Sequence, residues 1–355
     1  MNLPQILIEF KSKAQSIIQR SERGVVAVIL KDNTAGAIPF SIYKSLSDVE
    51  FEKMSEKNYR YLKLIFDGAP YKVMVAVIPE EDNNYSKALK VLENYKWNYL
   101  VVPSANEEST PVISSWIKEQ RTNNKKTFKA VLANHAADCE GIINFTTGNI
   151  VSTITGNEVK LTAAEYCARI AGIVAGLSLS RSLTYYVLTD IISADIPSNP
   201  EELVNKGELV ILFDGEKYKI ARGINSYTSG NNEDLKKIKV IESKDTVYQD
   251  IKTTFEEKYV GKVINDYDNK QNLVAAIVTY FKSMEGDVLD RTYNNSCAIS
   301  LEDQRSYLLS QGEDTEAMSD IEILQANTGS MVFLTAAIKF VDAMEDLKME
   351  INMQE

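Results

Sequence analysis

The sequence holds few side chains that could act as a catalytic nucleophile or base. His135 is the single histidine, so a Ser-His-Asp or Cys-His mechanism would have to use it. It follows an apolar run that ends at Ala133, a position that suits an active-site loop but also a histidine bound to nearby backbone. The nearest serine motif, Gly176-Leu-Ser-Leu-Ser180, lacks the second glycine of a nucleophile elbow. We therefore predict no catalytic residue, and an α/β enzyme with a site near His135 is the alternative.

Motifs for nucleotides and metals are also incomplete. Gly261-Lys262 lacks the earlier glycine of a phosphate-binding loop. Asp266-Tyr-Asp268 begins like a calcium loop, but Lys270 occupies the third ligand position. The sequence therefore predicts no cofactor and no metal. The three cysteines match no metal-ligand spacing; they are Cys139, Cys167 and Cys297.

The composition argues against several classes of partner. The 355 residues carry a formal net charge of -11, which opposes binding to nucleic acid or to an anionic membrane. Neither an apolar run of membrane-spanning length nor a basic leader followed by an apolar stretch is seen. Few, widely spaced cysteines fit a reducing compartment. We expect synthesis in the cytoplasm, no nucleic-acid partner and no direct insertion into a membrane.

Both ends of the chain alternate apolar and polar residues. This period of two indicates a strand that buries one face, whereas chain ends are more often frayed and polar. Neither segment has an obvious partner within the chain, so the pattern predicts strands that pair with another subunit. The alternating apolar residues are Ile6, Ile8 and Phe10 near the N-terminus and Leu347, Met349 and Ile351 near the C-terminus.

The region between them begins with an alternation of predicted strands and helices. Such spacing favours right-handed crossovers and a largely parallel sheet. The predicted strands cover residues 24–30, 71–78, 99–102 and 128–133, and the predicted helices cover 47–66, 86–97 and 110–121.

The next stretch contains one well-marked helix. Thr162 and Glu165 form a capping box at its start, and Ala168, Gly172 and Gly176 predict that another element packs closely against it. Further strands are predicted at 185–188, 209–213 and 235–240, with a hairpin turn at 214–215.

From about residue 242 the pattern changes to two helices, at 244–260 and 271–284, followed by strands at 292–299, 321–324 and 331–341. The last of these is predicted to be half-buried and antiparallel, and its alternating apolar residues include Val332, Leu334, Ile338 and Phe340. Helices followed by strands indicate a separate α+β domain. The predicted organisation is an N-terminal arm (1–20), an α/β domain (21–241), an α+β domain (242–341) and a C-terminal arm (342–355).

Seven segments, taken together and in this order, resemble the contractile tail sheath protein of phages, phage tail-like bacteriocins and defective prophages, in its compact Gram-positive form. The resemblance covers nearly the whole chain. The segments are GAPYKVMVAV (68–77), YSKALKVLE (85–93), LTAAEY (161–166), SLTY (182–185), RGINS (222–226), TFEEKYVGK (254–262) and VDAMEDLK (341–348).

The resemblance implies a structural subunit and not an enzyme. Its α/β domain is then subtilisin-like without a protease triad, and its inner domain combines the C-terminal region with the N-terminal arm. Subunits of this family donate terminal strands to neighbours, so residues 331–341 would receive strands, while links around 12–23 and 342–346 bend. The family polymerises as a helical tube around a tail tube and contracts to drive that tube through a target envelope.

The implied partners are further copies of the chain, the tail tube protein, and baseplate and tail terminator proteins. The implied location is the bacterial host cytoplasm during synthesis, then the virion tail or a tail-like particle released on lysis. Another strand-exchanging component, from a baseplate or a terminator, remains an alternative to the sheath.

Overall fold

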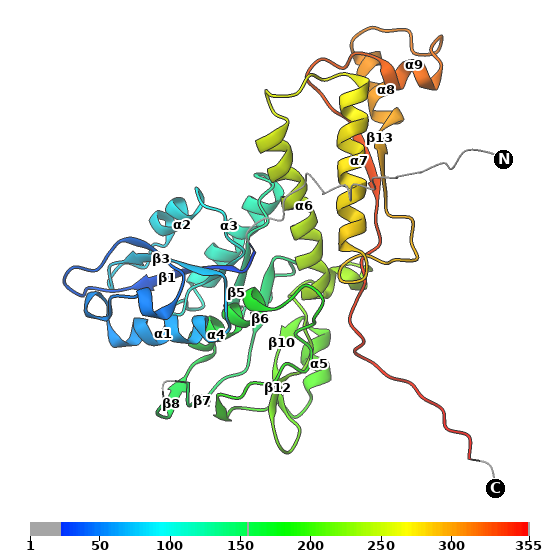
Figure 1. The fold of residues 1–355 in the computed structure, drawn as a ribbon. Coiled ribbons are helices and arrows are strands. Elements are labelled where there is room, and N and C mark those ends of the chain that lie inside the picture. Colours follow the sequence, from blue (N-terminus) through cyan, green and yellow to red (C-terminus); the bar gives the residue numbers. More distant parts are fainter. Residues whose placement is uncertain (1–22, 155, 354–355) are drawn as a thin grey trace, which may run out of the picture. The chain divides into compact units, whose positions relative to one another are not determined.

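The computed structural model describes residues 23–353 except residue 155, and these residues form two compact units (Figure 1). The α/β unit contains residues 23–246 and 342–353, and the C-terminal unit contains residues 247–341. The predicted N-terminal strand, with Ile6, Ile8 and Phe10, lies outside the described residues.

A seven-stranded sheet forms the centre of the α/β unit, with the strand order β10-β6-β5-β4-β1-β3-β2. All neighbouring strands are parallel except β2, which runs antiparallel to β3. The predicted parallel sheet is therefore confirmed. Its strands are β1 (Val25–Lys31), β2 (Phe40–Tyr43), β3 (Lys72–Ile78), β4 (Tyr99–Val101), β5 (Lys129–Ala133), β6 (Ile142–Phe145) and β10 (Glu208–Leu209).

Helices cover both faces of this sheet. Val26 and Val28 of β1 pack in one apolar layer with α1 and α4, whereas Ala27 and Ile29 pack in the other layer with α2 and α3. This division follows from the alternation of side chains along a strand. The helices of this unit are α1 (Glu56–Phe66), α2 (Ser86–Leu92), α3 (Ser109–Thr122), α4 (Ala163–Gly176) and α5 (Pro200–Asn205).

The capping box predicted for α4 is present. The Thr162 hydroxyl accepts a hydrogen bond from the Glu165 backbone, and the Glu165 carboxylate accepts one from the Thr162 backbone. The close packing predicted from its glycines is also confirmed, because a Cβ at Gly172 would lie 2.1 Å from the carbonyl oxygen of Ile65. The partner of α4 is therefore α1.

Smaller sheets complete the α/β unit. β7 (Ile150–Ser152) pairs with β8 (Val159–Leu161) and β9 (Ile191–Ser193), and β11 (Ile211–Phe213) pairs with β12 (Tyr218–Ile220). The hairpin turn predicted at 214–215 joins β11 to β12. The strand predicted at 185–188 is wrong, since only Val187 makes a bridge there, to Lys219.

Two further predictions in this unit are corrected. The helix predicted from residue 47 begins at Glu56, because Ser55 caps it and two short 3-10 turns, Leu46–Asp48 and Phe51–Lys53, precede it. The strand predicted at 235–240 is instead a 3-10 turn followed by the start of α6 (Ile238–Lys258). Ile238 and Ile241, one helical turn apart, are both buried there.

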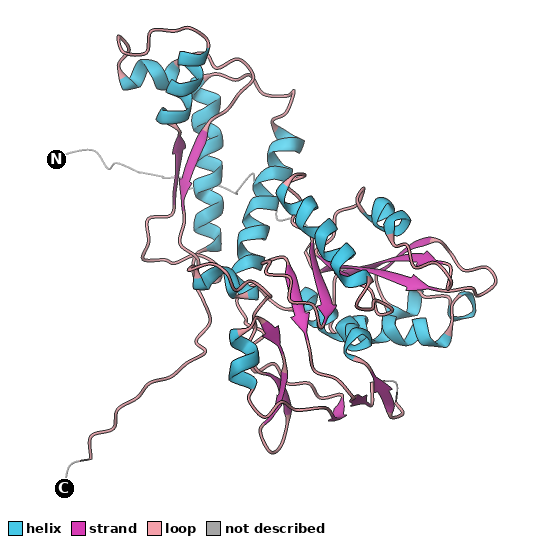
Figure 2. Ribbon diagram, turned by 180° about the vertical axis from the view of Figure 1, so that it is seen from behind, coloured by secondary structure: helices cyan, strands magenta, loops and turns pink. Residues whose placement is uncertain are grey.

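The C-terminal unit contains the rest of α6, α7 (Tyr267–Met284), β13 (Ser296–Ile299), α8 (Leu301–Ser310), α9 (Asp320–Gln325) and β14 (Leu334–Ala337). The two predicted helices are confirmed with earlier starts. The strand predicted at 321–324 is wrong: it is helix α9, which begins at a capping box of Ser319 and Glu322. Figure 2 shows β13 and β14 side by side along α7.

Candidate functional site

No hydrogen bond or ion pair joins the His135 side chain to a described serine or cysteine. The backbone N–H of His135 donates to Asn144 Oδ1 at 2.7 Å, and its half-buried imidazole makes no hydrogen bond or ion pair with any described residue. Burial, aided by Lys118, lowers the pKa of His135, and burial raises the pKa of the Cys139 and Cys167 thiols. A buried thiol with a raised pKa is a poor nucleophile.

The calcium-like loop serves a structural purpose. Asp266 caps α7 by accepting a hydrogen bond from the Asn269 backbone at 2.8 Å, and the buried Lys270 ammonium donates to Thr328 Oγ1 at 3.0 Å. A cation therefore lies where a metal ligand would be needed. Within residues 23–353, residue 155 apart, no three His, Cys, Asp or Glu side chains are grouped so as to hold a metal ion.

No described helix combines the length and the apolar composition that a membrane-spanning helix needs.

The predicted C-terminal strand is exposed in the subunit. We call residues 347–353 the C-terminal segment, drawn as an extended red trace in Figure 1. Leu347 is 87 % exposed, Met349 68 % and Ile351 72 %, and the segment pairs with no described strand. Soluble proteins rarely leave large apolar side chains exposed together.

The predicted receiving sheet contains two described strands, β13 and β14, paired antiparallel with Ile299 opposite Leu334. Val332, Leu334, Ile338 and Phe340 are all half-buried. Phe340 continues the pairing through a bridge to Leu289. A two-stranded ribbon is marginally stable by itself and gains from a further strand or a helix packed on it.

The link between these elements, which we call the acidic root (residues 342–346), is held by side chains of the α/β unit. Two guanidinium nitrogens of Arg222 donate to the two carboxylate oxygens of Asp346, at 3.2 and 2.7 Å. Lys237 donates to Asp342. The predicted bending link is therefore anchored in the subunit.

Glu345 completes the attachment of the acidic root. Its Oε1 accepts hydrogen bonds from the Ser182 hydroxyl at 2.5 Å and the Thr184 hydroxyl at 2.7 Å. Sequence reasoning missed this cluster, although three of the seven segments that carried the resemblance meet in it: 182–185, 222–226 and 341–348. Their order along the chain gives no sign that they are neighbours.

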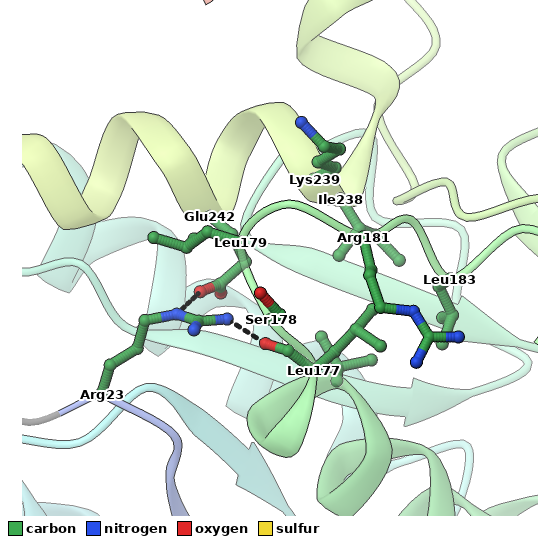
Figure 3. A pocket seen from close by; sticks show the side chains of 10 residues that line it. Arg23, Leu177, Ser178, Leu179, Arg181, Leu183, Ile238, Lys239 and Glu242 are labelled. Atoms are coloured by element: carbon green, nitrogen blue, oxygen red, sulfur yellow. Dashed lines mark hydrogen bonds and ion pairs between the residues drawn. The ribbon is translucent and has the colours of Figure 1, made fainter. Parts of the chain in front are cut away.

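Arg23, the first described residue, is held in a comparable way. Figure 3 shows its guanidinium between the end of α4 and the start of α6. Nη2 donates to the carbonyl of Leu177, and Nε lies 3.6 Å from Glu242 Oε2. The chain therefore enters the described α/β unit at a fixed point.

A buried ionic cluster fixes the start of α6 to the sheet. Lys129 Nζ lies 2.9 Å from Glu242 Oε1 and 3.1 Å from Asp245 Oδ2, and Arg121 binds Asp245 through both terminal nitrogens. Burial acts to raise the pKa of Asp245, but Lys129 and Arg121 outweigh it and hold that pKa below its ordinary value. The Tyr99 hydroxyl also donates to Glu242.

The link between α6 and α7 exposes apolar side chains in the C-terminal unit. Ile264 is 77 % exposed, and Val260 and Val263 are also exposed. Together with Phe255 and Tyr259 they line a groove. The inward face of α7, by contrast, is buried within its own unit.

These features define an α/β subunit with an anchored, apolar C-terminal segment. Two family models match the chain: the phage tail sheath protein central domain over residues 81–226 and the phage tail sheath C-terminal domain over residues 230–354. The tail sheath protein of Clostridium phage phiCD119 is 37 % identical over an alignment of 369 residues that covers 99 % of each chain. The chain belongs to the phage tail sheath family.

Solved structures have the same fold at low sequence identity. The contracted helical sheath of the anti-feeding prophage matches with a TM-score of 0.70 and 14 % identity over 100 % of both chains. The sheath tail protein from Desulfitobacterium hafniense matches with a TM-score of 0.67 and 16 % identity, covering 83 % of this chain and 93 % of that one. With the family assignment, the chain is a structural subunit of a contractile tail sheath.

Proposed function

We propose that the subunit polymerises by donating its terminal strands to neighbouring copies. Its predicted parts then have distinct roles: residues 21–241 form a subtilisin-like, non-catalytic sheath domain, 242–341 form the inner domain, and 1–20 and 342–355 form the arms. Copies joined in this way build a helical tube around an inner tail tube. Contraction of the tube drives the inner tube through a target envelope without nucleotide or catalysis.

The exposed C-terminal segment carries this proposal. An added strand gains backbone hydrogen bonds, and its alternate side chains fix the register. Burying Leu347, Met349 and Ile351 at about 1.5 to 3 kcal/mol each gives roughly 5 to 9 kcal/mol before ordering costs. The two-stranded β13–β14 ribbon, with half-buried Leu334 and Ile338, is the surface that we assign to receive strands.

The remaining partners follow from the same function. The sheath subunit associates with the tail tube, the baseplate and the tail terminator, and it is made in the host cytoplasm and released on lysis. The link between α6 and α7, with exposed Val260, Val263 and Ile264, offers more apolar surface for a tube contact than the buried face of α7.

Electron microscopy of the purified full chain and of two truncated forms tests the strand exchange. The full chain is expected to form tubes, and chains lacking residues 1–12 or 347–355 are expected to remain folded by circular dichroism without forming them. Tubes from both truncated forms would contradict the proposal. Short rings or caps from the full chain would favour a baseplate or terminator component.

A His135→Ala variant tests whether His135 contributes to assembly, whereas under the enzyme alternative the same change would abolish an activity. A sheath subunit without catalysis should assemble like the unchanged protein, because the imidazole makes no hydrogen bond or ion pair with the described residues. Loss of assembly in a folded variant would instead give His135 a role that the contacts do not show.

A further inference from the structure

We propose that Ser182, Thr184, Arg222 and Lys237 form a clamp that positions the C-terminal segment for donation to a second copy. The clamp holds the acidic root in the subunit before assembly and so sets the direction in which Leu347 and the residues after it leave the α/β unit. This inference rests on the proposed strand donation.

The chemistry of the acidic root fits such a role. Three of its five residues are acidic, and each is bound by the α/β unit: Asp342 by Lys237, Glu345 by two hydroxyls and Arg222, and Asp346 by Arg222. The positive groups come from the segment after β12 and from the residue before α6. Attachment at three points along five residues leaves this part of the chain little freedom to turn.

The Arg222 contact fixes direction as well as position. A guanidinium that donates two parallel hydrogen bonds to one carboxylate holds that carboxylate in its own plane. The same Nη2 lies 3.4 Å from Glu345 Oε2. Asp346 is therefore held at both carboxylate oxygens, and Leu347 follows directly.

The hydroxyl side of the clamp is tied to the arginine side. Thr184 Oγ1 accepts a hydrogen bond from the backbone N–H of Gly223 at 2.9 Å, next to Arg222, and donates to Glu345. The side chain of Glu345 is only 9 % exposed. Ser182, Thr184 and Arg222 are thus joined in one network through Glu345, and Lys237 adds a separate pair with Asp342. Glu345 is the most enclosed carboxylate of the acidic root.

Positioning of this kind lowers the cost of assembly. A segment that is ordered before binding loses less conformational freedom when it pairs with a neighbour. The clamp orders residues 342–346 and leaves the apolar residues beyond them exposed. Only the C-terminal segment then still has to become ordered when it binds a neighbouring copy. Arg222 and Lys237 should therefore affect the concentration at which tubes form without touching the neighbouring copy.

The test compares Arg222→Ala, Lys237→Ala and Arg222→Lys in the full chain. Hydrogen exchange of residues 342–353 is measured in the monomer, together with the critical concentration for tube formation. Loss of one partly exposed ion pair should raise the critical concentration by up to about fivefold and speed exchange of the acidic root. Arg222→Lys, which keeps the positive charge near Asp346 and Glu345, should change both less than Arg222→Ala does. Arg305→Ala, which removes a 2.8 Å pair with Asp320 of similar exposure, is the matched control and should change neither.

Each outcome decides the proposal. Unchanged exchange in Arg222→Ala, faster exchange with an unchanged critical concentration, or equal effects of Arg222→Lys and Arg222→Ala would overturn the positioning role. If a single variant unfolds, Thr184→Val, which removes only the hydroxyl, gives the same two measurements. Tubes formed by a chain without residues 347–355 would show that strand donation itself fails, and the exchange of residues 342–346 would then report the clamp separately.

Discussion

Arg222 and Asp346, 124 positions apart in the sequence, are joined by two hydrogen bonds of 3.2 and 2.7 Å. This contact ties the acidic root, from which the C-terminal segment continues, to the rest of the α/β unit. At the other end of the described chain, Arg23 is tied to Leu177 and Glu242 of the same unit. The described α/β unit therefore holds both places from which the proposed arms extend, and movement of the arms must begin beyond these contacts or break them.

The Arg222 contact predicts how the acidic root responds to pH. Hydrogen bonds from Arg222, with a further attraction from Lys237, hold the pKa of Asp346 below that of an ordinary carboxyl group. A lowered carboxyl pKa stabilises the attached state above the ordinary value of roughly 3.9, and this contribution is lost as the pH falls through the lowered value. The attachment should be complete at neutral pH and should weaken only in acid.

A carbon NMR titration of the Asp346 carboxyl group measures this directly. In Arg222→Ala the titration should move up toward the ordinary value, because the main cause of the shift is removed. Arg305→Ala is the control and should leave it in place. Identical titrations of Asp346 in the unchanged protein and in Arg222→Ala would contradict the attachment.

Local signals predicted the fold well where one short pattern decided the structure. The capping box of Thr162 and Glu165 gave the start of α4, and Gly172 predicted its close contact with another element. The strand prediction at 321–324 failed because a pattern of four residues, with Ile321 and Ile323 two positions apart, fits a strand and a helix alike. The capping box at Ser319 was the better signal.

Contacts between distant residues could not be predicted in the same way. The segment 235–240 has apolar residues at strand-like spacing, but buried pairing of Glu242 and Asp245 with Lys129 holds it as the start of α6. Likewise, the acidic residues of 342–346 gave no indication that Arg222 would lie opposite them. The sequence predicted a terminal strand, whereas its anchor is seen only in the folded α/β unit.

The buried ionic cluster predicts a large loss of stability when one partner is removed. Lys129→Met leaves two buried carboxylates, Glu242 and Asp245, without their shared cation. Breaking a buried pair in this way costs about 3 to 5 kcal/mol, which urea unfolding followed by circular dichroism can measure. Lys206→Ala removes an exposed pair with Glu202 and should leave the midpoint unchanged. A Lys129→Met midpoint equal to that of the control would contradict the importance of the cluster.

The contact between α1 and α4 predicts that alanine is harmful at Gly172. In an open helix this change would stabilise by about 1 kcal/mol, but here the new Cβ would meet the Ile65 carbonyl oxygen at 2.1 Å. Overpacking of this kind costs typically 1 to 3 kcal/mol, so the sign of the effect is diagnostic. Thermal unfolding should show a lower midpoint for Gly172→Ala.

Gly148→Ala is the matched control for that change. The nearest atom to its added Cβ is a side-chain oxygen of Asp195 at 3.9 Å, an ordinary contact distance. Its midpoint should stay close to that of the unchanged protein. A higher midpoint for Gly172→Ala would mean that the two helices can move apart at little cost.

The two faces of the C-terminal segment predict opposite effects on assembly. Serine at Leu347, Met349 and Ile351 removes the face that a neighbouring copy would bury, and tube formation should be lost. Alanine at Lys348, Glu350 and Asn352 changes the other face, and tubes should still form because the register depends on the apolar side chains. Sedimentation and electron microscopy distinguish the two results.

The same pair of variants tests where the apolar face is buried. Leu347, Met349 and Ile351 are exposed in the subunit, so replacing them with serine should leave thermal unfolding of the monomer unchanged while assembly fails. A lowered unfolding midpoint in the monomer would mean that these side chains pack within their own subunit. Equal loss of tubes in both variants would show that assembly depends on the side chains of both faces. The apolar face alone would then not determine the register.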